Sequence, residues 1–177
     1  MRQLLLLRHA KSSWDDKELP DHERPLNPRG RRAASAMRDA MAKLGLVPDL
    51  VLVSTAVRTR QTLEALEPWP DTPLVEPVER LYDADLPALF DVLHEVKETV
   101  RSVLLVAHNP GLHELAMSLV GAHAMTFASA DLRRLAEGYP SGALTEFTVA
   151  GPWFSLDGGG GRLVRFLCPR DLPDGGE

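Results

Sequence analysis

The 177-residue sequence contains a single cysteine, Cys168, and no long hydrophobic run. One cysteine excludes an intramolecular disulfide, which favours a reducing compartment. The leading apolar run, Leu4 to Leu7, is too short for a signal peptide, and no stretch reaches the roughly 20 apolar residues that a membrane-spanning helix needs. We therefore expect a cytoplasmic protein that does not associate with a membrane.

Positive charge is also scarce, because the formal net charge is -5 at pH 7. Such a balance argues against a nucleic-acid partner, although a local cluster of arginines can still bind phosphate groups. The sequence has no cysteine cluster, and His108 and His113 are not separated by the four residues of a helical metal-binding pair. We expect neither a metal ion nor another cofactor.

Short apolar runs alternate with segments of helical periodicity along the chain. Hydrophobic residues make up 44% and charged residues 25%, as in soluble globular proteins, and the length suits one domain over residues 1–177, with a flexible tail from about residue 170. The alternation predicts an α/β domain with a mostly parallel sheet. The predicted strands are Gln3 to Leu7, Leu50 to Val53, Val103 to Val106, Leu144 to Val149 and Leu163 to Leu167. The predicted helices are Pro28 to Leu44, with Asn27 as N-cap and Gly45 as stop, Ala56 to Glu67, Leu86 to about Val96, and Pro110 to Val120.

Polar, anion-binding residues follow three of the predicted strands. Arg8 and His9 end the first, Ser54 ends the second with Arg58 just beyond, and His108 follows the third. Each residue alone is most simply an ordinary surface or ion-paired side chain. Together they favour a functional site, because ligands of open parallel sheets bind beyond the carboxyl ends of the strands.

Two arginines and two histidines form a set that suits phosphoryl transfer. Guanidinium groups match phosphate oxygens in bidentate geometry, and a neutral imidazole is a competent nucleophile near pH 7. A second histidine can donate a hydrogen bond to the developing charge. Catalysis of phosphoryl transfer is mainly positioning and electrostatic stabilisation, which such a set can supply.

Four segments, LLRHAKS, RPLNPRG, VLVSTAVRTRQT and LLVAHNP, occur in this order. With them the chain resembles the short-chain branch of the histidine phosphatase superfamily, and within it the SixA-type phosphohistidine phosphatases. The resemblance implies a phosphoglycerate-mutase-like, three-layer α/β/α fold with a minimal lid. It also implies a reaction in two steps, without a metal, in which His9 takes the phosphoryl group and water then removes it.

The same resemblance assigns roles to individual residues. His9 matches the histidine that accepts phosphate, and Arg8 and Arg58 match ligands of the phosphate pocket. His108 matches the second histidine that contacts the transferred group. Arg24 matches the arginine of the RPL segment, where it either shapes the pocket or bridges to Asp21 or Glu23. We also place Asn109, the neighbour of His108, among the substrate-binding candidates.

The general acid is sought in the segment VERLYDAD. Asp83 stands where longer superfamily members carry a glutamate that protonates the leaving oxygen, and Glu79 and Asp85 lie nearby. An ordinary solvated loop carboxylate is the alternative for all three residues. A site without an evident acid suits phosphohistidine, because water can protonate an imidazole leaving group at its remote nitrogen, whereas an alkoxide needs a proton from the enzyme.

The leading hypothesis is a monomeric phosphatase that removes phosphate from phosphohistidine on a protein partner. Only a short, proline-rich segment separates Arg58 from the next predicted helix, which leaves little material for a lid over the site. One alternative is a phosphatase or mutase of the same superfamily for small phosphate esters. Another is a phosphate-binding interaction module without turnover, and a metal-dependent hydrolase is the last.

Overall fold

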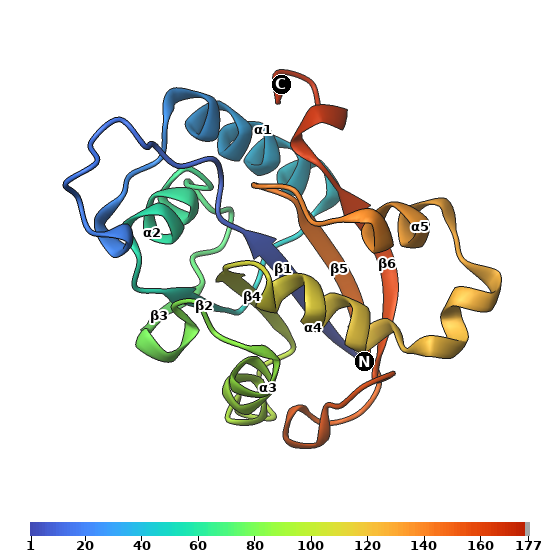
Figure 1. Ribbon diagram of the computed structural model, residues 1–177. Coiled ribbons are helices and arrows are strands. Elements are labelled where there is room, and N and C mark those ends of the chain that lie inside the picture. Colours follow the sequence, from blue (N-terminus) through green and yellow to red (C-terminus); the bar gives the residue numbers. More distant parts are fainter. Residues whose placement is uncertain (176–177) are drawn as a thin grey trace.

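The computed structural model describes residues 1–175 of the chain, and a six-stranded sheet runs through its centre (Figure 1). The strand order is β3-β2-β4-β1-β5-β6. The first four of these strands are mutually parallel, while β5 runs antiparallel to both β1 and β6. The strands are β1 (Arg2–Arg8), β2 (Leu50–Ser54), β3 (Leu74–Val78), β4 (Ser102–Ala107), β5 (Leu144–Val149) and β6 (Gly161–Leu167).

Helices cover both faces of the sheet. They are α1 (Pro28–Leu44), α2 (Val57–Glu64), α3 (Leu86–His94), α4 (Gly111–Val120) and α5 (Ala130–Glu137). The core cluster on one face holds residues of α3, α4 and α5, and the cluster on the other face holds residues of α1 and α2. The predicted single-domain, three-layer, mostly parallel α/β/α fold is confirmed. None of the helices within residues 1–175 is long and apolar enough to cross a membrane.

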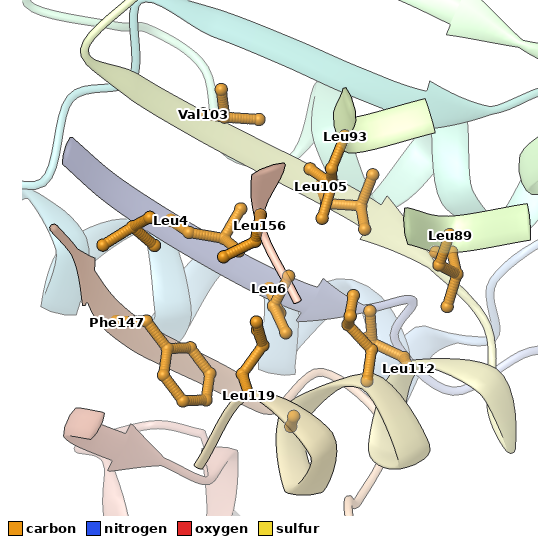
Figure 2. Packing of buried hydrophobic residues seen from close by; sticks show 14 of the residues in the cluster. Leu4, Leu6, Leu89, Leu93, Val103, Leu105, Leu112, Leu119, Phe147 and Leu156 are labelled. Carbon is orange, nitrogen blue, oxygen red and sulfur yellow. The ribbon is translucent and has the colours of Figure 1, made fainter. Parts of the chain in front are cut away.

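The four leucines of β1 are divided between the two cores. Leu4 and Leu6 point into the cluster with α3 and α4, which Figure 2 shows, whereas Leu5 and Leu7 point into the cluster with α1 and α2. Successive side chains of a strand point to opposite faces, so a central strand that is covered on both sides must be apolar at every position. The continuous leucine run therefore places β1 in the middle of the sheet.

The helix that follows the first loop begins and ends where the sequence predicts. The Oδ1 atom of Asn27 accepts a hydrogen bond from the backbone N–H of Gly30 at 2.8 Å, and Gly45 ends α1 in the left-handed conformation with φ at 67°. A Cβ atom on Gly30 would lie 2.1 Å from the carbonyl oxygen of Lys11. The glycine thus allows the start of α1 to pack directly against the loop after β1.

The helix after β2, the edge strand β3 and the helix α5 differ from the prediction or were missed. The second helix ends at Glu64 rather than Glu67, and tight turns follow it. The edge strand β3 was missed because it is mostly exposed and contains Pro77, and α5 was not predicted either. In the predicted flexible tail, Pro169–Asp171 form a 3₁₀ turn and Gly175 is buried, while residues 176–177 lie outside the described residues.

Candidate active site

The carboxyl ends of β1, β4 and β2 bring the predicted residues to one edge of the sheet. β4 lies between β1 and β2 in parallel register, with Arg8 paired to Ala107. The ends of the three strands therefore lie side by side, with His9 after β1, His108 after β4 and Ser54 at the end of β2. The expected convergence of three strand ends is present, and it brings the ring centroids of His9 and His108 to 5.3 Å.

The imidazole of His9 is held in one orientation. Its Nδ1 lies 2.7 Å from the carbonyl oxygen of Ala10, and since a carbonyl can only accept, Nδ1 carries the proton. The Nε2 atom is then the nitrogen with the free electron pair. The backbone of Ala10 is held as well, because its N–H donates a hydrogen bond to the hydroxyl of Thr62 at 2.9 Å. The His9 side chain thus has the tautomer that a nucleophile requires.

His108 is anchored from β2. Its Nε2 lies 2.7 Å from the hydroxyl oxygen of Ser54, and the residue is only 3% exposed. The other ring nitrogen, Nδ1, is buried and has no hydrogen-bond partner within residues 1–175. It lies 3.9 Å from Oδ1 of Asp83. The imidazole therefore has one nitrogen committed to the protein and one available to an incoming group.

Arg58 is buried at the start of α2 and is held by Asp21, a residue that the sequence suggested only as a partner of Arg24. Its Nη1 donates to the carbonyl oxygen of Asp21 at 2.8 Å, and its Nη2 donates to Oδ2 of the same residue at 3.0 Å. The Nε atom of Arg58 is buried without a partner among the described residues. Oδ2 of Asp21 also accepts a hydrogen bond from the hydroxyl group of Tyr82. Asp21 thus fixes the guanidinium from the loop side of the site.

Arg24 shares this carboxylate. Its Nε and Nη2 donate to Oδ1 of Asp21 at 3.1 and 3.0 Å, and its Nη1 donates to the Ser12 hydroxyl at 2.8 Å. Of the two bridges proposed from sequence, the structure has the one to Asp21. The Arg24 guanidinium carbon lies 3.5 Å from the centroid of the Trp14 ring. Trp14 is nevertheless 71% exposed. This stacking pins the loop that follows β1.

Arg8 and Asn109 are both attached to Tyr139. Nη1 of Arg8 and Nδ2 of Asn109 each donate to the Tyr139 carbonyl oxygen at 2.9 Å. The Nε of Arg8 and the Oδ1 of Asn109 are buried without partners in the described part of the chain. Arg8 therefore lies beside His9 with donor capacity left over, while the amide nitrogen of Asn109 is already used within the protein.

Asp83 lies at the mouth of the site rather than inside it. Its Oδ1 is 3.8 Å from Nη2 of Arg58, and its side chain is 56% exposed. The backbone has φ at 46°, a left-handed conformation that aspartate and asparagine tolerate better than most residues. The structure thus brings Asp83 to the two residues that a general acid would have to accompany, Arg58 and His108.

Burial and positive neighbours keep both histidines neutral. Burial, and to a smaller extent the nearby charges of Arg58, Arg8 and Arg24, lower the pKa of His9 to about 4, although the hydrogen bond to the Ala10 carbonyl opposes this change. Burial, then the closeness of a second titratable imidazole at His9 and the charge of Arg58, lower the pKa of His108 to about 3. At neutral pH the free electron pair on Nε2 of His9 is therefore not blocked by a proton.

The hydrogen bond from Tyr82 and those from Arg24 and Arg58 lower the pKa of Asp21 to about 2. The carboxyl group of Asp21 thus stays ionised and serves as a counter-ion, whereas a general acid would have to hold a proton at working pH.

An open cleft of about 470 Å³ leads to this cluster. It lies within the size range of small-ligand sites, and most of its polar lining consists of basic and hydroxyl side chains, with Asp15 and Asn27 beside them. No group of three or more histidine, cysteine, aspartate or glutamate residues that could hold a metal ion is found within residues 1–175. The residues that line the cleft include Arg8, His9, Lys11, Ser12, Ser13, Trp14, Arg24, Arg58 and Ser141.

Comparison with known proteins agrees with this geometry. A model of the histidine phosphatase superfamily (branch 1) matches residues 4–88. An uncharacterized protein of Mycobacterium tuberculosis is 38% identical over 165 residues, which cover 93% of this chain and 100% of that protein. The chain belongs to the histidine phosphatase superfamily.

Two solved structures relate this histidine phosphatase to the SixA-like members. The "putative phosphohistidine phosphatase SixA" of Nakamurella multipartitia has a TM-score of 0.81 at 28% identity, covering 94% of this chain and 95% of the other. The structure of the same description from Agrobacterium tumefaciens has a TM-score of 0.80 at 28% identity, covering 95% and 98%. The resemblance that the four sequence segments indicated is thereby confirmed.

Several residues of this site were not predicted as functional residues from the sequence. Asp21 begins one short 3₁₀ turn and Tyr82 follows another. Thr62 binds the backbone N–H of Ala10, and Ser54 binds the ring of His108. Ser54 was noted from the sequence as the polar residue that ends the second strand, but no role was assigned to it. The others act through contacts between segments far apart in the chain, which periodicity and spacing do not encode.

The low pKa values give this histidine phosphatase a testable pH dependence. An unfolded histidine binds a proton below about pH 6.5, whereas folded His9 does so only near its pKa of about 4. The unfolded state thus binds more protons in this window, and the free energy of unfolding falls as the pH decreases. Between pH 7 and pH 5 we expect wild type to lose roughly 2 kcal/mol more than His9→Asn. Urea titrations at both values measure this difference, and equal losses would contradict the assignment.

Proposed function

We propose that this protein is a metal-independent phosphatase that works through a phosphohistidine intermediate on His9. The observation that carries the proposal is the state of the His9 side chain. It is neutral, its Nδ1–H is held by the Ala10 carbonyl, and its Nε2 is left unprotonated beside Arg8 and Arg58. A module that only binds phosphate needs the arginines but has no use for an oriented, unprotonated imidazole.

The first step is attack of Nε2 of His9 on phosphorus. The bond from nitrogen to phosphorus forms while the bond from phosphorus to the leaving group breaks, and the leaving group departs with the electron pair of that bond. Arg8, Arg58 and the buried Nδ1 side of His108 supply donors to the three phosphoryl oxygens. In the second step water attacks phosphorus, phosphate departs, and neutral His9 is restored.

Arg24 and Asn109 have supporting roles in this proposal. Arg24 holds the Asp21 carboxylate and lines the cleft, so it adds positive charge near the phosphoryl group. Asn109 is fastened to the same carbonyl as Arg8, and it orients the strand end that carries His108.

The substrate we propose is phosphohistidine on a protein partner. The cleft is open, and Asp83, whose Oδ1 lies 3.9 Å from Nδ1 of His108, is half-exposed at the rim. An imidazole leaving group can take its proton from water, so a site without a buried acid suffices for it. The two similar structures described as putative phosphohistidine phosphatases support the same class. Hydrolysis of small phosphate esters is the second candidate, and the position of Asp83 favours it.

The proposal is tested by phosphate release from two probes in the presence of a chelator. One is a histidine-containing phosphotransfer protein phosphorylated with phosphoramidate, and the other is p-nitrophenyl phosphate. We expect turnover of both, with the higher kcat/KM on phosphohistidine. Hydrolysis of the aryl ester alone would indicate a phosphatase for small esters. Loss of activity with chelator would indicate a metal-dependent hydrolase. Absence of turnover on both probes would indicate a phosphate-binding module.

Replacement of Asp83 by asparagine separates the two substrate classes. Asparagine tolerates the left-handed backbone at this position, so the fold is kept. If Asp83 protonates the leaving oxygen, kcat on p-nitrophenyl phosphate falls by about 10²-fold while phosphohistidine turnover falls by less than about tenfold. Asp85→Asn is the matched control, because asparagine caps α3 as well as Asp85 does. Equal losses on both substrates would contradict the leaving-group argument.

A further inference from the structure

A second cavity adjoins the catalytic cleft between the start of α1 and the last part of the chain. Figure 1 shows the C-terminal segment beside α1. Lys11 and Ser141 line both this cavity and the cleft that contains His9, so the two hollows meet at these residues. Since Lys11 is two residues from His9, an extended backbone places it within about 7 Å of the nucleophile, from Cα to Cα.

The charged residues that line the second cavity are all positive. They are Lys11, Arg29 and Arg170, and within residues 1–175 no aspartate or glutamate lines it. All three are exposed, and neither Lys11 nor Arg170 forms an ion pair with any described residue. The floor is apolar and includes Ala33, Cys168 and Pro169. This concentration of positive charge stands out in a chain whose net charge is -5.

The proposed reaction does not account for this charge. The phosphoryl group is surrounded by Arg8, Arg58 and Arg24, whereas Arg29 and Arg170 line only the second cavity. A cationic surface beside a reaction centre attracts a group of opposite charge and orients the molecule that carries it. The adjoining cavity would thus recognise an anionic group held on the same molecule as the phosphoryl group.

We propose that this cavity is a docking subsite for an acidic side chain of the phosphoprotein substrate, a few residues from the phosphohistidine. The proposal rests on the phosphohistidine phosphatase function argued above. A carboxylate at this distance pairs with Arg170 and Lys11 while the apolar floor takes the stem of the glutamate side chain. Proteins whose phosphohistidine lies in an acidic segment are therefore the preferred partners.

Two phosphohistidine peptides test the subsite. They are identical except that one carries glutamates and the other glutamines at the second and third positions on each side of the phosphohistidine. We expect kcat/KM to be higher for the glutamate peptide, with the difference residing in KM and decreasing at high salt. In the double variant Arg29→Glu, Arg170→Glu the preference falls by about tenfold or reverses. Turnover of p-nitrophenyl phosphate is unchanged, because neither arginine lines the catalytic cleft.

The matched control is the double variant Arg31→Glu, Arg162→Glu, which changes the net charge by the same amount at exposed arginines that line neither cavity. It should retain the preference for the glutamate peptide. Equal kcat/KM on the two peptides in wild type, or equal effects of both double variants, would overturn the subsite and leave the proposed function intact. Absence of turnover on every phosphohistidine probe, with the aryl ester still hydrolysed, would overturn both.

Discussion

His9→Asn is expected to abolish turnover of phosphohistidine and of aryl phosphate alike, by at least about 10⁴-fold in kcat. Asparagine keeps an amide N–H that can donate to the Ala10 carbonyl, which the Nδ1–H of His9 does in the wild-type protein. It lacks a nitrogen with a free electron pair, so no covalent intermediate can form. Phosphate release from both probes, followed over hours, measures the loss.

Binding should survive this change in part, because Arg8, Arg58 and Arg24 all remain. Inorganic phosphate should therefore still bind to His9→Asn in a calorimetric titration. Intact-mass measurement at alkaline pH should show one added phosphoryl group on wild type and none on the variant. His123→Asn is the matched control, since His123 is exposed and far from the cleft in sequence. Residual turnover in His9→Asn close to that of wild type would exclude His9 as the nucleophile.

Arg58→Lys is expected to lower kcat/KM by about 10² to 10³-fold although the charge is conserved. The guanidinium uses Nη1 and Nη2 on Asp21 and has Nε left for a further acceptor. A lysine ammonium reaches one point only, so it cannot hold Asp21 and a phosphoryl oxygen in the same geometry. Loss of transition-state stabilisation should appear mainly in kcat.

Arg60→Lys serves as the control for this substitution, because Arg60 lies on the same helix and is exposed. It should show wild-type kinetics. The free energy of unfolding of both variants, measured in urea, separates a damaged fold from a damaged site. Wild-type rates in Arg58→Lys would remove Arg58 from the phosphate pocket.

Much of the fold could be predicted because burial imposes local patterns. The leucine run of β1 and the apolar runs of β2 and β4 are continuous because these strands are covered on both faces. The bounds of α1 follow from Asn27, Pro28 and Gly45, whose effects act within one turn. The edge strand β3 escaped prediction because an exposed strand has no burial pattern to display.

The location of the site could be predicted for the same reason. Parallel strands end at one edge, so the order of strands and helices already places Arg8, His9, Arg58 and His108 near one another. Their surroundings could not be predicted. Asp21 comes from a loop, and it reaches Arg58 across 37 positions of the sequence. Nothing in the spacing of either residue indicates that contact.

The sequence by itself thus determined the α/β class, the buried first strand and the four residues at or just beyond the strand ends. The tertiary structure decided how those residues are held: which nitrogen of His9 is free, which carboxylate fixes Arg58, and which basic residues gather beside the cleft. The physical reason is the distance along the sequence over which each interaction acts. Burial patterns and caps act over a few residues, whereas hydrogen bonds between loops depend on which segments the packed core brings together.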